Sequence, residues 1–263
     1  MKFKYTDYHI HTNYSHDIKE NGPQFKDYIT IAEEKCINIC YLDHYELYYI
    51  ENDPTYPFYN GKISNYLEEL DDLKEEYGDF ILCGLEVDYY PDREEELWGF
   101  MDEYGKDLDF VGGSVHEFVY EYPVTTKRLL QELLNKKKTS EVIETYFKTM
   151  EMMVESRIFS NVCHIDTIFR YINEKDISPP QKIESYQERI INLGRKCIEN
   201  NINIEYNLSG NRFSIGRPFP SFEVMKVLIE DGANFFVGSD SHSLDYFESQ
   251  ILNVKKSYQT LGR

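Results

Sequence analysis

Short apolar runs alternate with longer stretches of helical periodicity along this chain of 263 residues. The runs are rich in β-branched and aromatic residues, and polar or turn residues end them, which is typical of strands. Seven strands are predicted, over Phe3–Ile10, Ile37–Leu42, Phe80–Val87, Phe110–Val115, Ser160–Ile165, Ile202–Leu208 and Asn234–Gly238. Helices are predicted between and after them, over Gln24–Lys35, Asn65–Tyr77, Arg93–Tyr104, Glu141–Ser156, Lys182–Asn200, Phe222–Asp231 and Leu244–Tyr258. Ser64, Ser140 and Ser221 are predicted as helix N-caps.

The regular alternation of strand and helix favours a parallel sheet, because right-handed crossovers through helices connect parallel strands. Seven such units predict an α/β fold, a slightly distorted (β/α)7 TIM-like barrel. No Pro-, Gly- or Ser-rich linker divides the chain, so a single domain over residues 1–263 is expected. Tyr45–Gly61 and Glu117–Lys138 are predicted as long loops over the strand ends. We interpret the lysine run that ends the second loop as a solvated helix face.

Composition narrows the class of protein. The formal net charge is −19, from 28 basic and 47 acidic residues, and this charge disfavours nucleic acid as a partner. The five cysteines show no C-x-x-C spacing and are interpreted as buried thiols in a reducing compartment. Neither a signal peptide nor an apolar stretch of membrane-spanning length is recognised. We therefore expect a cytoplasmic protein with no membrane contact.

Histidines and acidic residues gather at the ends of the predicted strands, where α/β barrels place their active sites. Nine candidate metal ligands are His9, His11, Asp17, His44, Glu86, His116, His164, Asp240 and His242. At a spacing of two, His9 and His11 project to the same side of their strand. Hydrogen-bonded histidines at a barrel rim would explain one or two of these residues but not the whole set. Nine ligands exceed one tetrahedral ion, so two or three ions of Zn, Fe or Mn are expected, with His16 behind them or at the surface.

The order of these motifs resembles the polymerase-and-histidinol-phosphatase (PHP) domain family over essentially the whole chain. The motifs are H-x-H-x5-D from His9 to Asp17, Asp43-His44, Gly84-Leu85-Glu86, Val115-His116, His164-x-Asp166 and Ser239-Asp240-x-His242. His164–Arg170 and Glu205–Arg212 are similar to the histidinol-phosphatase branch. The resemblance implies three divalent metal ions. The implied ligand sets are His9, His11, Glu86 and Asp240 for one ion, Glu86, His116 and His164 for a second, and Asp17, His44 and His242 for a third.

The implied activity is hydrolysis of a small phosphate monoester by a metal-bridging hydroxide. L-histidinol phosphate, an intermediate of histidine biosynthesis, is the expected substrate. Arg170 and Arg212 would bind the phosphate, since guanidinium groups fork onto phosphate oxygens. The predicted catalytic residues are Asp17, Glu86, Asp240 and His242. The donor of the leaving group's proton stays open between a metal-bound water, a histidine and an aspartate.

Two alternatives also stay open. One is a phosphoesterase of the same family that acts on a nucleotide or on phosphotyrosine. The other is a non-catalytic metal-binding domain, which the intact set of nine ligands disfavours. The sequence predicts no oligomeric state.

Overall fold

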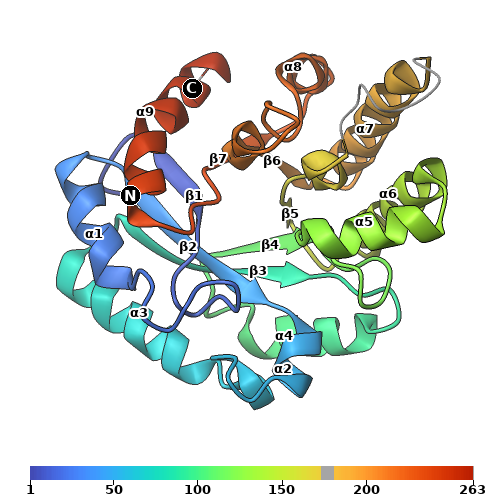
Figure 1. The fold of residues 1–263 in the computed structure, drawn as a ribbon. Helices are drawn as coiled ribbons and strands as arrows, with labels where there is room; N and C mark the ends of the chain where they lie inside the picture. The colour runs from blue at the N-terminus through green and yellow to red at the C-terminus, as the bar shows by residue number, and fades with distance from the viewer. Residues whose placement is uncertain (173–180, 263) are drawn as a thin grey trace. The chain divides into compact units, whose positions relative to one another are not determined.

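The computed structural model describes residues 1–172 and 181–262 and contains each predicted strand (Figure 1). The strands are β1 (Thr6–Ile10), β2 (Asn38–Tyr45), β3 (Ile81–Asp88), β4 (Phe110–Ser114), β5 (Asn161–Val162), β6 (Asn203–Asn207) and β7 (Phe235–Gly238). Their order in the sheet follows the chain from β1 to β7. Pairing is parallel between β1 and β2, between β2 and β3, and between β5 and β6. The prediction of a parallel seven-stranded α/β sheet is confirmed.

All seven predicted helices are present, and the described residues contain further short ones. The α-helices are α1 (Phe25–Glu34), α2 (Leu47–Asn52), α3 (Ser64–Tyr77), α4 (Glu94–Tyr104), α5 (Lys127–Lys136), α6 (Thr139–Ser156), α7 (Gln181–Glu199), α8 (Phe222–Glu230) and α9 (Leu244–Thr260). The 3-10 helices are η1 (Tyr59–Gly61), η2 (Thr167–Arg170) and η4 (Leu208–Arg212). The two stretches predicted as loops therefore contain α2, α5 and η1.

Two of the three predicted N-caps are wrong by one or two positions. Helix α3 begins at Ser64 itself, and α6 begins at Thr139 after Lys138. Ser221 is confirmed, because its hydroxyl accepts a hydrogen bond from the Val224 N–H at 3.3 Å. All three lysines of the run are exposed as expected, but only Lys136 belongs to a helix, as the last residue of α5, so the predicted helix face is wrong for Lys137 and Lys138.

The chain forms two compact units, and unit 1 comprises residues 1–87, 100–112 and 237–263. In this unit α1 packs against β2 and α9, and α9 packs against β1. The Tyr258 hydroxyl donates to the Thr6 carbonyl at 2.8 Å, so α9 is fastened to β1 by a buried hydrogen bond. The chain after β7 also lies beside β1, since the His11 N–H donates to the Ser241 carbonyl at 2.9 Å. These contacts bring the carboxyl ends of β1 and β7 together.

Unit 2 comprises residues 88–99 and 113–236. Helices α5, α6, α7 and α8 pack in succession, and α7 also packs against β6. The apolar face of α6 lies in the core, where the aromatic rings of Tyr146 and Phe147 are fully buried. Burial of such faces is the main source of stability in a domain of this size. The expectation of one domain over the whole chain stays a prediction.

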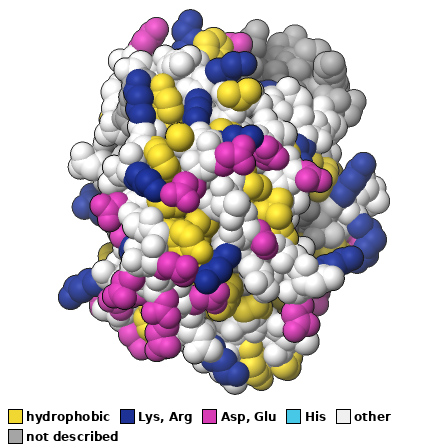
Figure 2. Space-filling model, turned by 90° about the vertical axis from the view of Figure 1, so that its left-hand side faces the viewer, with side chains coloured by type: hydrophobic (Ala, Val, Ile, Leu, Met, Phe, Trp, Pro, Cys, Tyr) yellow, Lys and Arg dark blue, Asp and Glu magenta, His cyan; other side chains and the backbone are white. Residues whose placement is uncertain are grey.

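The surface carries charges of both signs. Figure 2 shows a face on which acidic, basic and apolar side chains are interspersed, and none of the side chains coloured there is a histidine. Four cysteines are buried as expected, but Cys36 is exposed, and all five thiols are free. The prediction of burial is wrong for Cys36 because it follows α1 at a turn with φ of 52°. Within the described ranges, no helix is both long enough and apolar enough to cross a membrane.

Candidate metal centre

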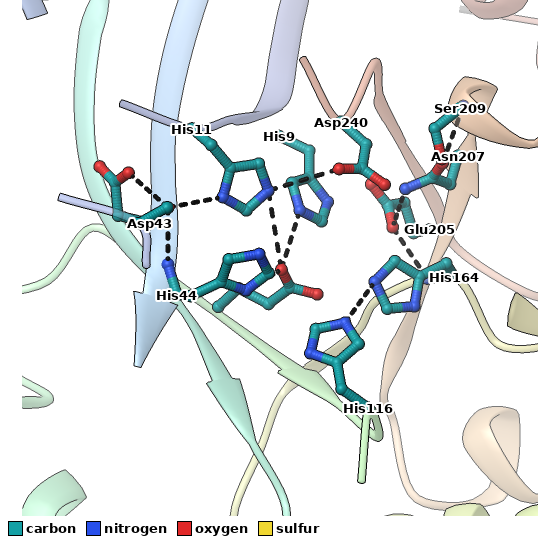
Figure 3. A network of polar contacts seen from close by, with 12 residues as sticks. His9, His11, Asp43, His44, His116, His164, Glu205, Asn207, Ser209 and Asp240 are labelled. Carbon is teal, nitrogen blue, oxygen red and sulfur yellow. Dashed lines mark hydrogen bonds and ion pairs between the residues drawn. The ribbon is translucent and has the colours of Figure 1, made fainter. Parts of the chain in front are cut away.

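Seven of the nine predicted ligands gather in unit 1 and are called the unit 1 cluster. They are His9, His11, Asp17, His44, Glu86, Asp240 and His242. Strand β1 carries His9 and leads directly into His11, β2 carries His44, and β3 carries Glu86. Asp240 and His242 follow β7. All of them lie at the carboxyl ends of their strands, and Figure 3 shows His9, His11, His44 and Asp240 close together.

The carboxylate of Glu86 lies among three imidazoles. Its Oε2 atom is 3.3 Å from His9 Nε2, 3.7 Å from His11 Nε2 and 3.1 Å from His44 Nδ1. Glu86 is only 1% exposed, so water does not screen these contacts. A buried carboxylate with several imidazoles around one oxygen has the arrangement of a bridging metal ligand.

Asp17, Asp240 and His242 form a second group of potential metal ligands together with His11 and His44. His11 Nε2 lies 3.4 Å from Asp240 Oδ1, and His242 Nε2 lies 3.0 Å from Asp17 Oδ2. One ring nitrogen each of His11, His44 and His242 lie within 4.8 Å of one another. Asp17 is the most accessible member, with 42% of its side chain exposed. The cluster thus extends from the buried end of β1 to a solvent-facing edge.

The backbone at Asp240 has a left-handed conformation, with φ of 57°. Residues with side chains seldom adopt this region and do so mainly where the surrounding structure enforces it, often at functional sites. The Asp240 N–H donates to the His9 carbonyl at 2.9 Å, which fixes the residue beside β1.

Burial lowers the pKa of the buried histidines of the cluster, and neighbouring charges add to this effect at His11 but oppose it at His44. Burial lowers the pKa of His11 well below its usual value, and the neighbouring imidazoles of His242 and His44 lower it further. Burial also lowers the pKa of His44, but the carboxylates of Glu86, Asp17 and Glu46 outweigh it and raise that pKa to about 10. The cluster therefore has an excess of negative charge that favours bound cations.

Divalent metal ions fit this donor set. The Nε2 atom of His11 is buried and receives no well-aligned hydrogen bond from the described residues. It nevertheless faces carboxylate oxygens at 3.4 Å and 3.7 Å, as a ligand to a shared cation would. One donor atom each of His9, His11 and Glu86 lie within 4.8 Å of one another. Imidazole and carboxylate donors without thiolate suit Zn, Fe or Mn.

The other two predicted ligands, His116 and His164, pair within unit 2. Their Nε2 atoms lie 3.3 Å apart, and the two residues are 2% and 1% exposed (Figure 3). Two ring nitrogens that converge in this way can ligate one ion. The family resemblance implies that Glu86 belongs to the same ligand set, and this stays a prediction.

Four buried carboxylates hold the loops that carry the ligands by accepting hydrogen bonds from their backbone. The sequence analysis did not assign this role to them. Asp7 Oδ1 accepts from the Ser239 N–H at 2.8 Å, just before Asp240. Asp88 accepts from the His116 N–H at 2.7 Å, and Glu205 accepts from the His164 N–H at 2.8 Å. Asp43 has the same role at the loop after β1, where it accepts from the Thr12 N–H at 2.6 Å. For Asp7 and Glu205, the sequence signal that could have found them is an acidic residue inside a predicted strand that is otherwise apolar, whereas Asp43 and Asp88 directly follow predicted strands.

The predicted phosphate-binding arginines lie on two 3-10 helices of unit 2. Arg170 ends η2, with its guanidinium 4.5 Å from the centre of the Phe213 ring, and Arg212 ends η4 and is exposed. Sequence reasoning missed Arg217, whose Nη1 lies 2.8 Å from the buried carboxylate of Asp166. The buried charge of Asp166, in the H-x-D motif, was the signal that a cation would be needed.

His16 lies behind the unit 1 cluster, in agreement with its predicted position. Its ring stacks on Tyr49 at 4.0 Å, and its Nδ1 atom is 3.7 Å from Glu46 Oε1. The same oxygen of Glu46 is 3.5 Å from His44 Nδ1. The segment after β2 thus adds an acidic and an aromatic group beside the cluster.

Comparisons with known proteins agree with these motifs. The family model of the PHP domain matches residues 7–209. The histidinol-phosphatase of Bacillus subtilis is 26% identical over 222 residues, which cover 78% of this chain and 81% of that protein. A Deinococcus radiodurans protein named "Probable histidinol-phosphatase" is 21% identical over 241 residues, which cover 85% of this chain and 82% of that protein.

A solved structure shares the fold. It is the histidinol phosphate phosphatase of Lactococcus lactis, complexed with zinc, L-histidinol and phosphate. Its TM-score is 0.67 at 21% identity, over 97% of this chain and 94% of the other. This likeness confirms the predicted α/β barrel fold class.

Proposed function

Because this chain belongs to the PHP domain family, we propose that it is a metal-dependent phosphatase that hydrolyses L-histidinol phosphate to L-histidinol and phosphate. The observation that carries the proposal is the unit 1 cluster, in which the buried Glu86 carboxylate lies 3.1 Å to 3.7 Å from three imidazoles. The names of the two curated relatives support the substrate. The zinc, histidinol and phosphate in the Lactococcus lactis structure support it further.

The nine predicted ligands would hold divalent ions, with Asp17, Glu86, Asp240 and His242 as catalytic residues. When bound, such ions polarise phosphoryl oxygens and lower the pKa of a coordinated water molecule. Arg170 and Arg212 would bind the phosphoryl oxygens and orient the ester, and a guanidinium fork matches two of these oxygens at once. Hydrolysis breaks the bond between phosphorus and the ester oxygen, and water supplies the hydroxyl of the phosphate and the proton of the alcohol.

The segment after β2 suits the organic part of this substrate. Histidinol phosphate carries an ammonium group and an imidazole, and Glu46 and Tyr49 supply a carboxylate and an aromatic face next to His16. Cations bind favourably to both kinds of group. We assign this segment to substrate selection, and we propose a cytoplasmic location and no nucleic-acid partner.

A comparison of substrates tests the proposed function. Phosphate release by the zinc- or manganese-loaded protein is measured with L-histidinol phosphate, a nucleoside monophosphate, phosphotyrosine and an aryl phosphate. We expect a kcat/KM for histidinol phosphate well above the other three. Similar kcat/KM values for all four esters, or a preference for another ester, would show that histidinol phosphate is not the substrate. Inactivity on all four would favour a non-catalytic metal-binding domain.

Ligand variants test the metal assignment separately. His116→Ala and Asp240→Ala should each lower metal content and turnover together, because each removes a donor from a buried site. His16→Ala is the matched control for metal content, since His16 is a histidine of the same region that is not assigned as a ligand. Full metal content in both ligand variants, measured by elemental analysis, would refute the assignment.

A further inference from the structure

The hydroxyl of Ser15 lies at a junction between the loop after β1 and the end of β2. Ser15 is 1% exposed. Its Oγ atom is 3.0 Å from His11 Nδ1, 2.7 Å from Asp43 Oδ1 and 3.1 Å from the backbone nitrogen of His44. Figure 3 shows the three partners of this hydroxyl, His11, Asp43 and His44, close together.

The protons of this junction can be assigned by counting donors. A serine hydroxyl donates one hydrogen bond and accepts two. The backbone N–H of His44 is a donor, so Ser15 accepts from it. Asp43 already accepts from the Thr12 N–H at 2.6 Å and from the Thr12 hydroxyl at 2.9 Å, so it acts as an acceptor. The single proton of Ser15 therefore goes to Asp43.

The remaining contact of Ser15 is with His11, and there the hydroxyl oxygen can only accept. The Nδ1 atom of His11 therefore carries a proton, and in the neutral ring Nε2 then keeps its lone pair. Nε2 is the atom that faces Glu86 and Asp240 at 3.7 Å and 3.4 Å. A metal-binding imidazole needs this form, with one nitrogen unprotonated and the other held by a hydrogen bond.

We propose that Ser15, oriented by Asp43, is a positioning residue that fixes His11 as the Nδ1–H tautomer with Nε2 free to bind a metal ion. The proposal rests on the proposed function only in taking His11 as a ligand. Without the Ser15 oxygen, the alternative tautomer would gain a hydrogen bond from Nε2–H to Asp240, and that proton would occupy the ligand position.

Nitrogen-15 NMR of the histidine rings in the metal-free protein tests the tautomer directly. We expect the Nδ1–H form at His11 in the wild type and a shift toward the Nε2–H form in Ser15→Ala. Ser15→Thr keeps a hydroxyl and should restore the Nδ1–H form. An Nε2–H tautomer at His11 in the wild type would overturn the proposal without any variant.

Zinc affinity, measured by competition with a chromogenic chelator, gives the second readout. Ser15→Ala should bind Zn²⁺ about 10- to 100-fold more weakly, the usual effect of removing a group that orients a ligand. Ser241→Ala is the matched control, because Ser241 is equally buried beside the ligands but its hydroxyl bonds to that of Ser239 at 2.6 Å. Its zinc affinity and His11 tautomer should stay unchanged. If Ser15→Ala leaves both the zinc affinity and the His11 tautomer unchanged, the positioning role of Ser15 is refuted. If the variant changes both but the wild-type protein hydrolyses no phosphate ester, the result counts only against the proposed function.

Discussion

The five free thiols of this chain occupy contrasting environments. Burial raises the pKa of Cys197 to about 12, whereas Cys36 is exposed. The thiolate is the reactive form, and a group with a pKa of about 12 forms almost none of it at pH 8. We therefore expect one thiol to react quickly with Ellman's reagent in the folded protein, and five after unfolding. Cys36→Ser should abolish the fast reaction, and two or more fast thiols in the wild type would contradict the buried positions.

Single residues also show how far the sequence could predict the site. His9 and His11 were found because strand alternation and the end of an apolar run are local signals. The partner of Asp7 could not be found in that way, since its carboxylate accepts from the backbone of Ser239, 232 positions away. The role of Ser15 could not be predicted from the sequence, because it depends on Asp43 and His44 converging on it from another strand.

At the scale of elements, η2 is held by the loop that follows η4. Arg217 pairs with Asp166 at the start of η2, and the Ser214 hydroxyl donates to the Arg170 carbonyl at its end, at 3.5 Å. Breaking a buried ion pair costs about 3–5 kcal/mol, and partial access of Arg217 to solvent reduces this. We expect Arg217→Met to lower the free energy of unfolding by about 2–4 kcal/mol, measured by urea denaturation.

A surface pair in the same unit provides the control for this change. Arg195 lies 2.8 Å from Asp231, the same distance as between Arg217 and Asp166, but 49% of its side chain is exposed. Arg195→Met should cost less than about 1 kcal/mol. Equal losses in the two variants would mean that Asp166 does not depend on Arg217.

Element boundaries show where local patterns stop being informative. All seven strands and the seven predicted helices lie within a few residues of their predicted bounds, since their apolar periodicity is set by the sheet they cover, whereas α2 and α5 lie in stretches predicted as loops. Helix α2 was missed because its six residues are too few to display a helical period. Helix α6 begins at Thr139, before the good capping residue Ser140, so the capping preference alone did not locate its start.

At the scale of the whole molecule, the alternation of strand and helix was sufficient to predict the fold class, because it restricts the chain to parallel crossovers. The division into two compact units was not predicted. Each unit contains segments that are distant in the sequence, such as residues 1–87 and 237–263, so no linker marks the boundary between the units.

The clustering of acidic groups in a chain with net charge −19 should make the whole protein more stable when metal ions are bound. A ligand at 100 times its Kd stabilises the folded state by about 2.7 kcal/mol per site. For a chain of this length, that corresponds to a rise of about 5–10 °C in Tm. We expect this rise when Zn²⁺ is added to chelator-treated protein at constant ionic strength, measured by differential scanning fluorimetry. Asp240→Ala should show a smaller rise than the His16→Ala control. A zinc-independent Tm in the wild type would mean that the clustered carboxylates and imidazoles do not bind the ion in the folded state.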